Sequence, residues 1–182
     1  MTIMNDDRDM KIVGDTKKAP AEKEVTAMKN ELDFQRVNGN LMKARELGQR
    51  FAFDVCNFDK YQGETDPVIC DQLRMLYAFT VDYTLNRCIP SEVVASAASV
   101  AYLTTLKDID EWFYDHLQIS GSFSMYLLEV RRNRGLTSLD MGTAFSKLCL
   151  RDDDPKYIKY GGELFDRWSK ECADRIKKYD FS

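Results

Sequence analysis

Residues 65–86 read TDPVICDQLRMLYAFTVDYTLN and contain the clearest helix start in the chain. Asp66 can accept hydrogen bonds from exposed backbone N–H groups, and Pro67 suits the first helical position because its missing N–H is not needed there. Apolar side chains then recur at spacings of three and four residues, which places them on one face of a helix. The side chains on the opposite face are Asp71, Arg74, Ala78 and Asp82. The stretch therefore predicts an amphipathic helix from Asp66 to Asn86 with one face in the core.

Helical periods continue on both sides of this stretch. They predict further helices over residues 21–37, 41–55, 91–106, 107–118, 122–134, 137–149 and 155–179. The segment from Ser91 to Leu106 is apolar or small nearly all the way round, as expected of a helix that others surround. No run alternates apolar and polar residues for long, so strands are not expected. The sequence predicts an all-α fold, a compact multi-helix orthogonal array or bundle with Ser91–Leu106 as its central small-residue helix.

The length of 182 residues leaves room for one core of about seven helices. The first 20 residues mix acids and bases, carry few large apolar side chains and show no sustained period, which is typical of disordered segments. We therefore expect a disordered N-terminal arm over residues 1–20 and a single all-helical domain over residues 21–182.

The composition restricts the compartment and the kind of partner. A formal net charge of −4 disfavours nucleic acid as a partner, because such binding depends on many Lys and Arg side chains. The five cysteines lie far apart and form no CxxC pair, which indicates reduced, buried thiols in a cytoplasmic protein. The longest charge-free stretch, Val93–Leu106, has 14 residues, too short for a membrane span of about 20. The N-terminus lacks the apolar run that a signal peptide needs. Because the sequence indicates neither a membrane span nor a signal peptide, no membrane partner is expected.

His116 is the single histidine. One imidazole cannot supply the side chains that catalytic triads and helical metal sites with two imidazoles require. His116 follows Trp112 by four residues, on the apolar face of its helix, which is typical of a partly buried imidazole bonded to a backbone carbonyl. A functional role for His116 stays open beside that reading. Two acidic clusters, at residues 108–115 and 152–154, lack the ligand spacing of an EF-hand. The sequence therefore predicts no catalytic residue, no metal ligand and no cofactor.

Arg131, Arg132 and Arg134 form the compact basic patch outside the chain ends. Such a patch could receive a phosphate or the acidic surface of a partner. Cations at the end of a helix also stabilise its dipole, which explains the same residues without any ligand. With His116, these three arginines are the candidate residues of a ligand or partner site.

Two main functional hypotheses follow from these observations, beside a third, a nucleic-acid adaptor that would use Arg131, Arg132, Arg134 and the N-terminal lysines. The sparse catalytic inventory favours a non-enzymatic helical protein that acts through contacts with a protein partner or with copies of itself, in an interaction or regulatory role. The alternative is a small-molecule-binding or catalytic helical domain with a pocket lined by the central helix, using His116, Tyr114 or a cysteine as polar groups. The chain carries no Gly-rich phosphate loop that would decide between them.

Overall fold

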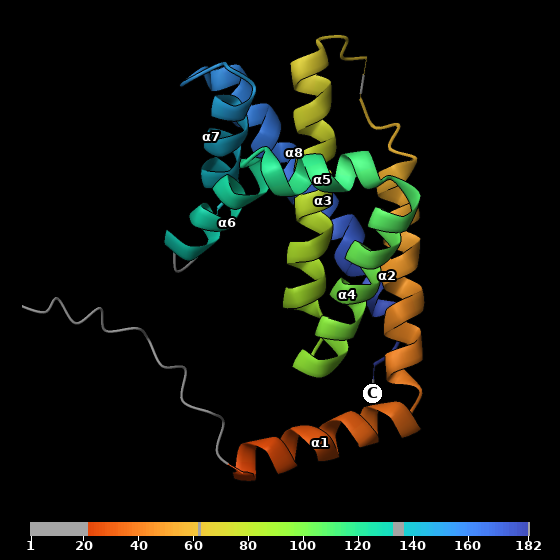
Figure 1. Cartoon of the computed structure of the whole chain (residues 1–182). Coiled ribbons are helices and arrows are strands. Elements are labelled where there is room, and N and C mark those ends of the chain that lie inside the picture. The colour runs from red at the N-terminus through yellow and green to blue at the C-terminus, as the bar shows by residue number, and fades with distance from the viewer. Residues whose placement is uncertain (1–21, 62, 133–136, 182) are drawn as a thin grey trace, which may run out of the picture.

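The structure of the protein, a computed structural model, describes residues 22–61, 63–132 and 137–181. Over these residues the chain forms eight α-helices and no strand, which confirms the predicted all-α fold (Figure 1). The helices are α1 (Glu22–Val37), α2 (Asn40–Cys56), α3 (Pro67–Cys88), α4 (Glu92–Ile109), α5 (Glu111–Ile119), α6 (Ser122–Arg132), α7 (Ser138–Leu148) and α8 (Pro155–Lys177). The arm predicted over residues 1–20 lies outside the described residues.

The helices pack in two pairs around α3. One pair is α2 with α4, the other is α7 with α8, and α8 also runs along α3. The short helices α5 and α6 connect the two pairs, and α1 lies across the ends of α2 and α4 (Figure 1). This arrangement is the predicted compact multi-helix array.

α3 is the most extensively buried of the described helices, and its polar face is not turned to solvent. Twelve of its residues are buried. The face expected to lie outside the core packs on α5 and α4 instead: Arg74 pairs with Asp110 at 2.7 Å, and the Ala78 carbonyl accepts a hydrogen bond from the Tyr102 hydroxyl at 3.2 Å. The amphipathic interpretation of residues 66–86 was therefore wrong for this face, because charged partners on other helices compensate its polar groups.

α4 has the central place predicted for Ser91–Leu106, since it packs against α1, α2, α3 and α5. It is not covered on every side, however. Ser96, Val100 and Thr104 form an exposed stripe along it, and Val100 keeps 61% of its accessible surface. The small residues therefore serve two purposes, because they allow close packing on one side of α4 and leave open space on the other.

The closest helix contacts occur at glycines. A Cβ at Gly48 of α2 would overlap the Ala98 carbonyl oxygen of α4 and lie 2.9 Å from the Tyr102 backbone nitrogen. α7 and α8 meet in the same way, because a Cβ at Gly142 would overlap the Ile158 carbonyl oxygen. At the same contact, Gly161 faces Phe145 of α7 within a continuous α8.

Helix starts agree with the local signals in the sequence. Asp66 accepts a hydrogen bond from the Val68 backbone N–H at 3.0 Å, and Thr137 forms a reciprocal capping box with Asp140. The segment predicted as one helix over residues 107–118 is divided, because Asp110 ends α4 and caps α5 by accepting from the Phe113 N–H at 3.0 Å. One carboxylate of the acidic cluster at residues 108–115 is thus a helix boundary.

All five cysteines are free thiols, as expected. The expectation that they are buried holds for Cys149 and Cys172 but is wrong for Cys88, which is exposed at the end of α3. Burial raises the pKa of both Cys149 and Cys172 to about 12, which keeps these thiols protonated near neutral pH. Within the described residues, no helix is both long and apolar enough to cross a membrane.

Candidate binding groove

His116 lies on α5, half-buried, and its Nε2 is 3.0 Å from Asp71 Oδ2 on α3. Its ring stacks on Trp112, with ring centroids 5.3 Å apart and planes inclined by 20°. The partner of the imidazole is thus a carboxylate rather than the backbone carbonyl expected from sequence. The pair fastens α5 to α3, which is a structural role.

Arg131 and Arg132, the two described arginines of the predicted basic patch, form no contact with His116 that joins them into one site. Arg131 and Arg132 are exposed in the last turn of α6, where cations favour the helix dipole, and Arg132 lies 3.6 Å from Glu129. No hydrogen bond or ion pair between described residues joins either arginine to His116. Arg134 lies outside the described residues. The described part of the proposed patch therefore consists of two exposed helix-end cations.

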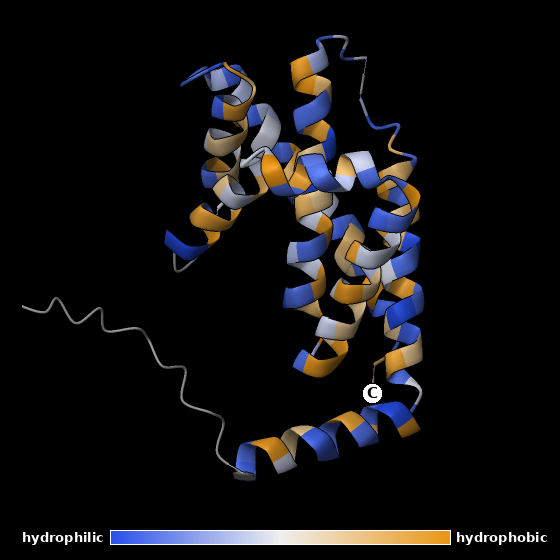
Figure 2. Cartoon of the chain, in the orientation of Figure 1, coloured by the Kyte–Doolittle hydropathy of each residue, from blue (hydrophilic) through white to orange (hydrophobic). Residues whose placement is uncertain are grey.

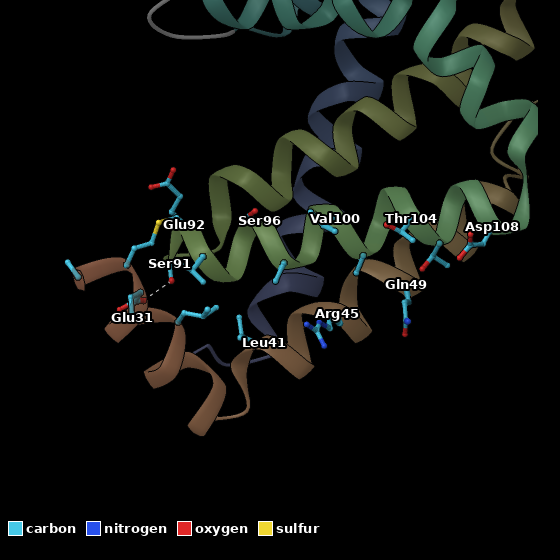
Figure 3. Close-up of a pocket in the computed structure, with 17 residues that line it drawn as sticks. Glu31, Leu41, Arg45, Gln49, Ser91, Glu92, Ser96, Val100, Thr104 and Asp108 are labelled. Carbon is cyan, nitrogen blue, oxygen red and sulfur yellow. Dashed lines mark hydrogen bonds between the residues drawn. The ribbon is translucent and has the colours of Figure 1, made fainter. Parts of the chain in front are cut away.

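A groove of about 920 Å³ runs between α1, α2 and α4 (Figure 3). Its α4 wall is the exposed stripe that contains Ser96, Val100 and Thr104, and its α2 wall presents Leu41 and Arg45 across from it. The remaining lining residues are Ala27, Met28, Glu31, Leu32, Gln49, Ser91, Glu92, Val93, Ala97, Ala101, Thr105 and Asp108. The groove is thus an apolar trough with polar edges.

The rim of the groove carries more negative than positive charge. Three carboxylates, those of Glu31, Glu92 and Asp108, line it together with the single guanidinium of Arg45. Among the described residues Arg45 takes part in no ion pair. A molecule that binds here would therefore meet a net acidic rim.

α1 exposes more large apolar side chains than any other described helix. Their exposed fractions lie between 37% and 85%, and they are Val25, Met28, Leu32, Phe34 and Val37. Figure 2 shows hydrophobic and hydrophilic residues alternating along α1. Met42, at the start of α2, is also 73% exposed. Apolar surface gathered on one element of a folded protein is typical of an interaction site.

Two hydrogen-bonded residues anchor the C-terminal half of α1 to the bundle. Glu31 accepts from the Ser91 hydroxyl and from the Gln35 amide, both at 2.9 Å, and these bonds lower the pKa of Glu31 (Figure 3). Gln35 is buried and accepts from the Asn40 amide at 2.7 Å. The anchors fix which face of α1 is directed to the bundle and which faces stay open.

A second hollow, of about 290 Å³, lies beside α1. It is formed by Glu24, Val25, Met28, Lys29 and Leu32 of α1 together with Val93 of α4. Met28 and Leu32 border both this hollow and the larger groove. Open apolar surface therefore lies on both sides of Met28 and Leu32.

Sequence reasoning predicted the helical period over residues 21–37 and, in its alternative hypothesis, a pocket lined by the central helix, but neither the exposure of Val25, Met28 and Leu32 nor the α1 and α2 walls of the groove. The periodicity was correct, while the burial depends on how α1 meets the bundle. No group of three or more potential metal-binding side chains occurs among the described residues. Comparison with protein-family models, curated proteins and solved structures gave no match for this chain.

Proposed function

We propose that this chain is a helical interaction protein that associates with copies of itself through α1. The observation that carries the proposal is the exposed apolar surface of α1, which the bundle leaves uncovered on two sides. Burying such surface between two copies is favourable by about 25 cal/mol per Å². Its exposure in an isolated chain makes association the natural way to cover it.

Light scattering coupled to size-exclusion chromatography tests this function. We expect a dimer of the 21.1 kDa chain, with a fraction that rises with concentration. Met28→Ser should raise the dissociation constant at least tenfold, because each copy loses an apolar contact. Ile119→Ser is the matched control, since Ile119 is 82% exposed on α5, and it should leave the dimer unchanged. A wild-type chain that stays monomeric at all concentrations would overturn the proposal.

A second function is supported by the size of the groove. A volume of about 920 Å³ falls in the range of small-molecule sites, and the α4 wall supplies the pocket beside the central helix that the alternative hypothesis requires. The polar groups differ from those expected, because neither His116, Tyr114 nor a cysteine lines it. Its acidic rim suits an apolar molecule that carries a positive charge.

A thermal-shift screen with cationic amphiphiles and metabolites distinguishes this second function. A true ligand should raise the melting temperature of the wild-type protein. Val100→Trp, which fills the groove from an exposed position, should abolish that rise. Stabilisation by no compound, or stabilisation that survives Val100→Trp, would exclude the groove as a small-molecule site.

A further inference from the structure

The outer face of α5 exposes an aromatic side chain of the kind that usually packs against other residues. Trp112 keeps 71% of its accessible surface, whereas Trp168, the second tryptophan of the chain, is buried in the core. Ile119, two turns further along the same face, is 82% exposed. Tryptophan is enriched among the residues that contribute most to protein–protein binding. The outer face of α5 therefore carries an anchor that the described part of the fold leaves uncovered.

The indole of Trp112 is held in place before anything binds to it. His116 stacks on one side of the indole, and His116 Nε2 lies 3.0 Å from Asp71 Oδ2 on α3. Because the imidazole is fixed at both ends, it also fixes the ring that it covers. The large exposed fraction of Trp112 leaves the opposite side of the indole open. A ring that is already ordered loses little side-chain entropy on binding.

Two exposed carboxylates, those of Glu111 and Asp115, lie beside this ring on α5. They are four residues apart, a spacing at which like charges destabilise a helix. Glu111 is in the first turn, where the helix dipole compensates for its charge, but Asp115 lies beyond that turn. Neither carboxylate forms an ion pair with a described residue. Helix stability therefore does not explain Asp115, which follows Trp112 by three residues.

The buried side of α5 shows which group such a pair can bind. Asp110 and Phe113, also three residues apart, together hold the guanidinium of Arg74. It donates to Asp110 Oδ2 at 2.7 Å and lies 3.7 Å from the ring centroid of Phe113. A planar guanidinium can stack on a ring and bond to a carboxylate at the same time, and indole is the best aromatic partner for a cation. Trp112 and Asp115 present the same two groups on the open side of the helix.

We propose that the outer face of α5 docks an arginine-bearing segment of a protein partner, with a guanidinium stacked on Trp112 and hydrogen-bonded to Asp115. Glu111 attracts a further cation of that segment, and Ile119 contacts its apolar side chains. Carboxylates at this position repel phosphates, so nucleic acid is not the occupant. The inference goes beyond the proposed self-association and does not depend on it, because α1 packs at the start of α4 and α5 follows its end (Figure 1).

Isothermal titration calorimetry of the full chain with hexa-arginine at low ionic strength tests this site. We expect binding, and Trp112→Leu and Asp115→Asn should each raise the dissociation constant about fivefold, because each removes one contact of the guanidinium. Asp152→Asn is the matched control, since it removes the same charge from another exposed position and should change the dissociation constant less than about twofold. Hexalysine should bind more weakly than hexa-arginine, because an ammonium has no planar face to stack.

Fluorescence quenching by acrylamide locates the bound peptide. Hexa-arginine should protect the tryptophan emission of the wild-type protein, since Trp112 is exposed and Trp168 is already shielded. Peptide binding that leaves the quenching unchanged would overturn the site.

The calorimetry has its own contrary results. No binding of hexa-arginine, equally tight binding of hexalysine, or a loss with Asp152→Asn as large as that with Asp115→Asn would each overturn the proposal. If Trp112→Leu dissociated a dimer of the chain, a second copy would occupy this face and the assignment to another protein would be wrong. Circular dichroism and melting temperature check the fold, and Asp115→Asn decides the outcome if Trp112→Leu changes either of them.

Discussion

Gly48→Ala should destabilise the folded protein by about 3 kcal/mol, measured as the free energy of unfolding in urea. The added Cβ overlaps the Ala98 carbonyl oxygen, and backbone on the facing helix cannot rotate away as a side chain can. α2 and α4 must therefore separate, which loosens the core around the buried Leu47 and Phe51. Since these two helices also form the walls of the groove, the substitution should widen it.

The neighbouring substitution Gln49→Ala is the control for Gly48→Ala. Gln49 is exposed on the same turn of α2, so its truncation should change the free energy of unfolding by less than about 0.5 kcal/mol. Equal stability of Gly48→Ala and the wild type would show that α2 and α4 do not cross as closely as described.

Arg74→Ala should also cost about 3 kcal/mol, through loss of contacts that join three helices. Arg74 Nε donates to the Val55 carbonyl at 3.0 Å, in the last turn of α2, where carbonyls lack helical partners. Its Nη2 donates to Asp110 Oδ2 at 2.7 Å, and its guanidinium lies 3.7 Å from the ring centroid of Phe113. One side chain thus links the end of α2 to the start of α5.

Arg50→Ala is the matched control, because Arg50 pairs with Glu46 on the exposed surface of α2. Its loss should cost less than about 1 kcal/mol. A cost for Arg74→Ala no larger than that for Arg50→Ala would contradict the linking role of Arg74.

The effect of Arg74→Ala should depend on pH through Asp110. Partial burial alone would raise the pKa of Asp110, but hydrogen bonds from Arg74 and the Phe113 N–H outweigh it and lower the pKa overall. A lowered pKa contributes stability above the ordinary value of about 3.9, and this contribution is lost as the pH falls through the folded-state pKa. The stability difference between wild type and variant should therefore narrow below about pH 4. A difference that is constant from pH 7 to pH 3 would contradict this coupling.

The helix starts could be predicted from sequence because their determinants are local. Asp66 and Thr137 lie within three residues of the N–H groups they cap, so their role is visible in the chain itself. The fold class followed from the same kind of information, since the apolar period of each helix is a property of adjacent turns.

The polar face of α3 could not be predicted, because its partners are distant in sequence. Arg74 meets Asp110 across 36 positions, and Asp71 meets His116 across 45. A charged residue on a helix indicates solvent unless a partner is known, and periodicity gives no information on partners. Sequence also does not show which side of α4 is buried and which is exposed, because small residues suit both environments.

The groove and the exposed apolar surface of α1 both depend on the direction in which α1 leaves the bundle. The turn at Gly39, where φ is +74°, sets this direction, and glycine adopts this left-handed conformation without strain. A glycine in the sequence predicts a turn but not the angle between the helices that it joins. The helical period over residues 21–37 was therefore predicted, while the exposure of Val25, Met28 and Leu32 was not.

The sparse anchoring of α1 also determines how amide protons there should exchange with solvent. Of the side chains described in α1, from Lys23 to Val37, only Gln35 is buried. An element with so little buried surface opens at a lower free energy than helices such as α3, whose amides report global unfolding. We therefore expect α1 to open as a separate cooperative unit at the edge of the fold. If α1 forms the proposed dimer contact, dimer formation should slow exchange in α1 and leave the protection of α3 unchanged.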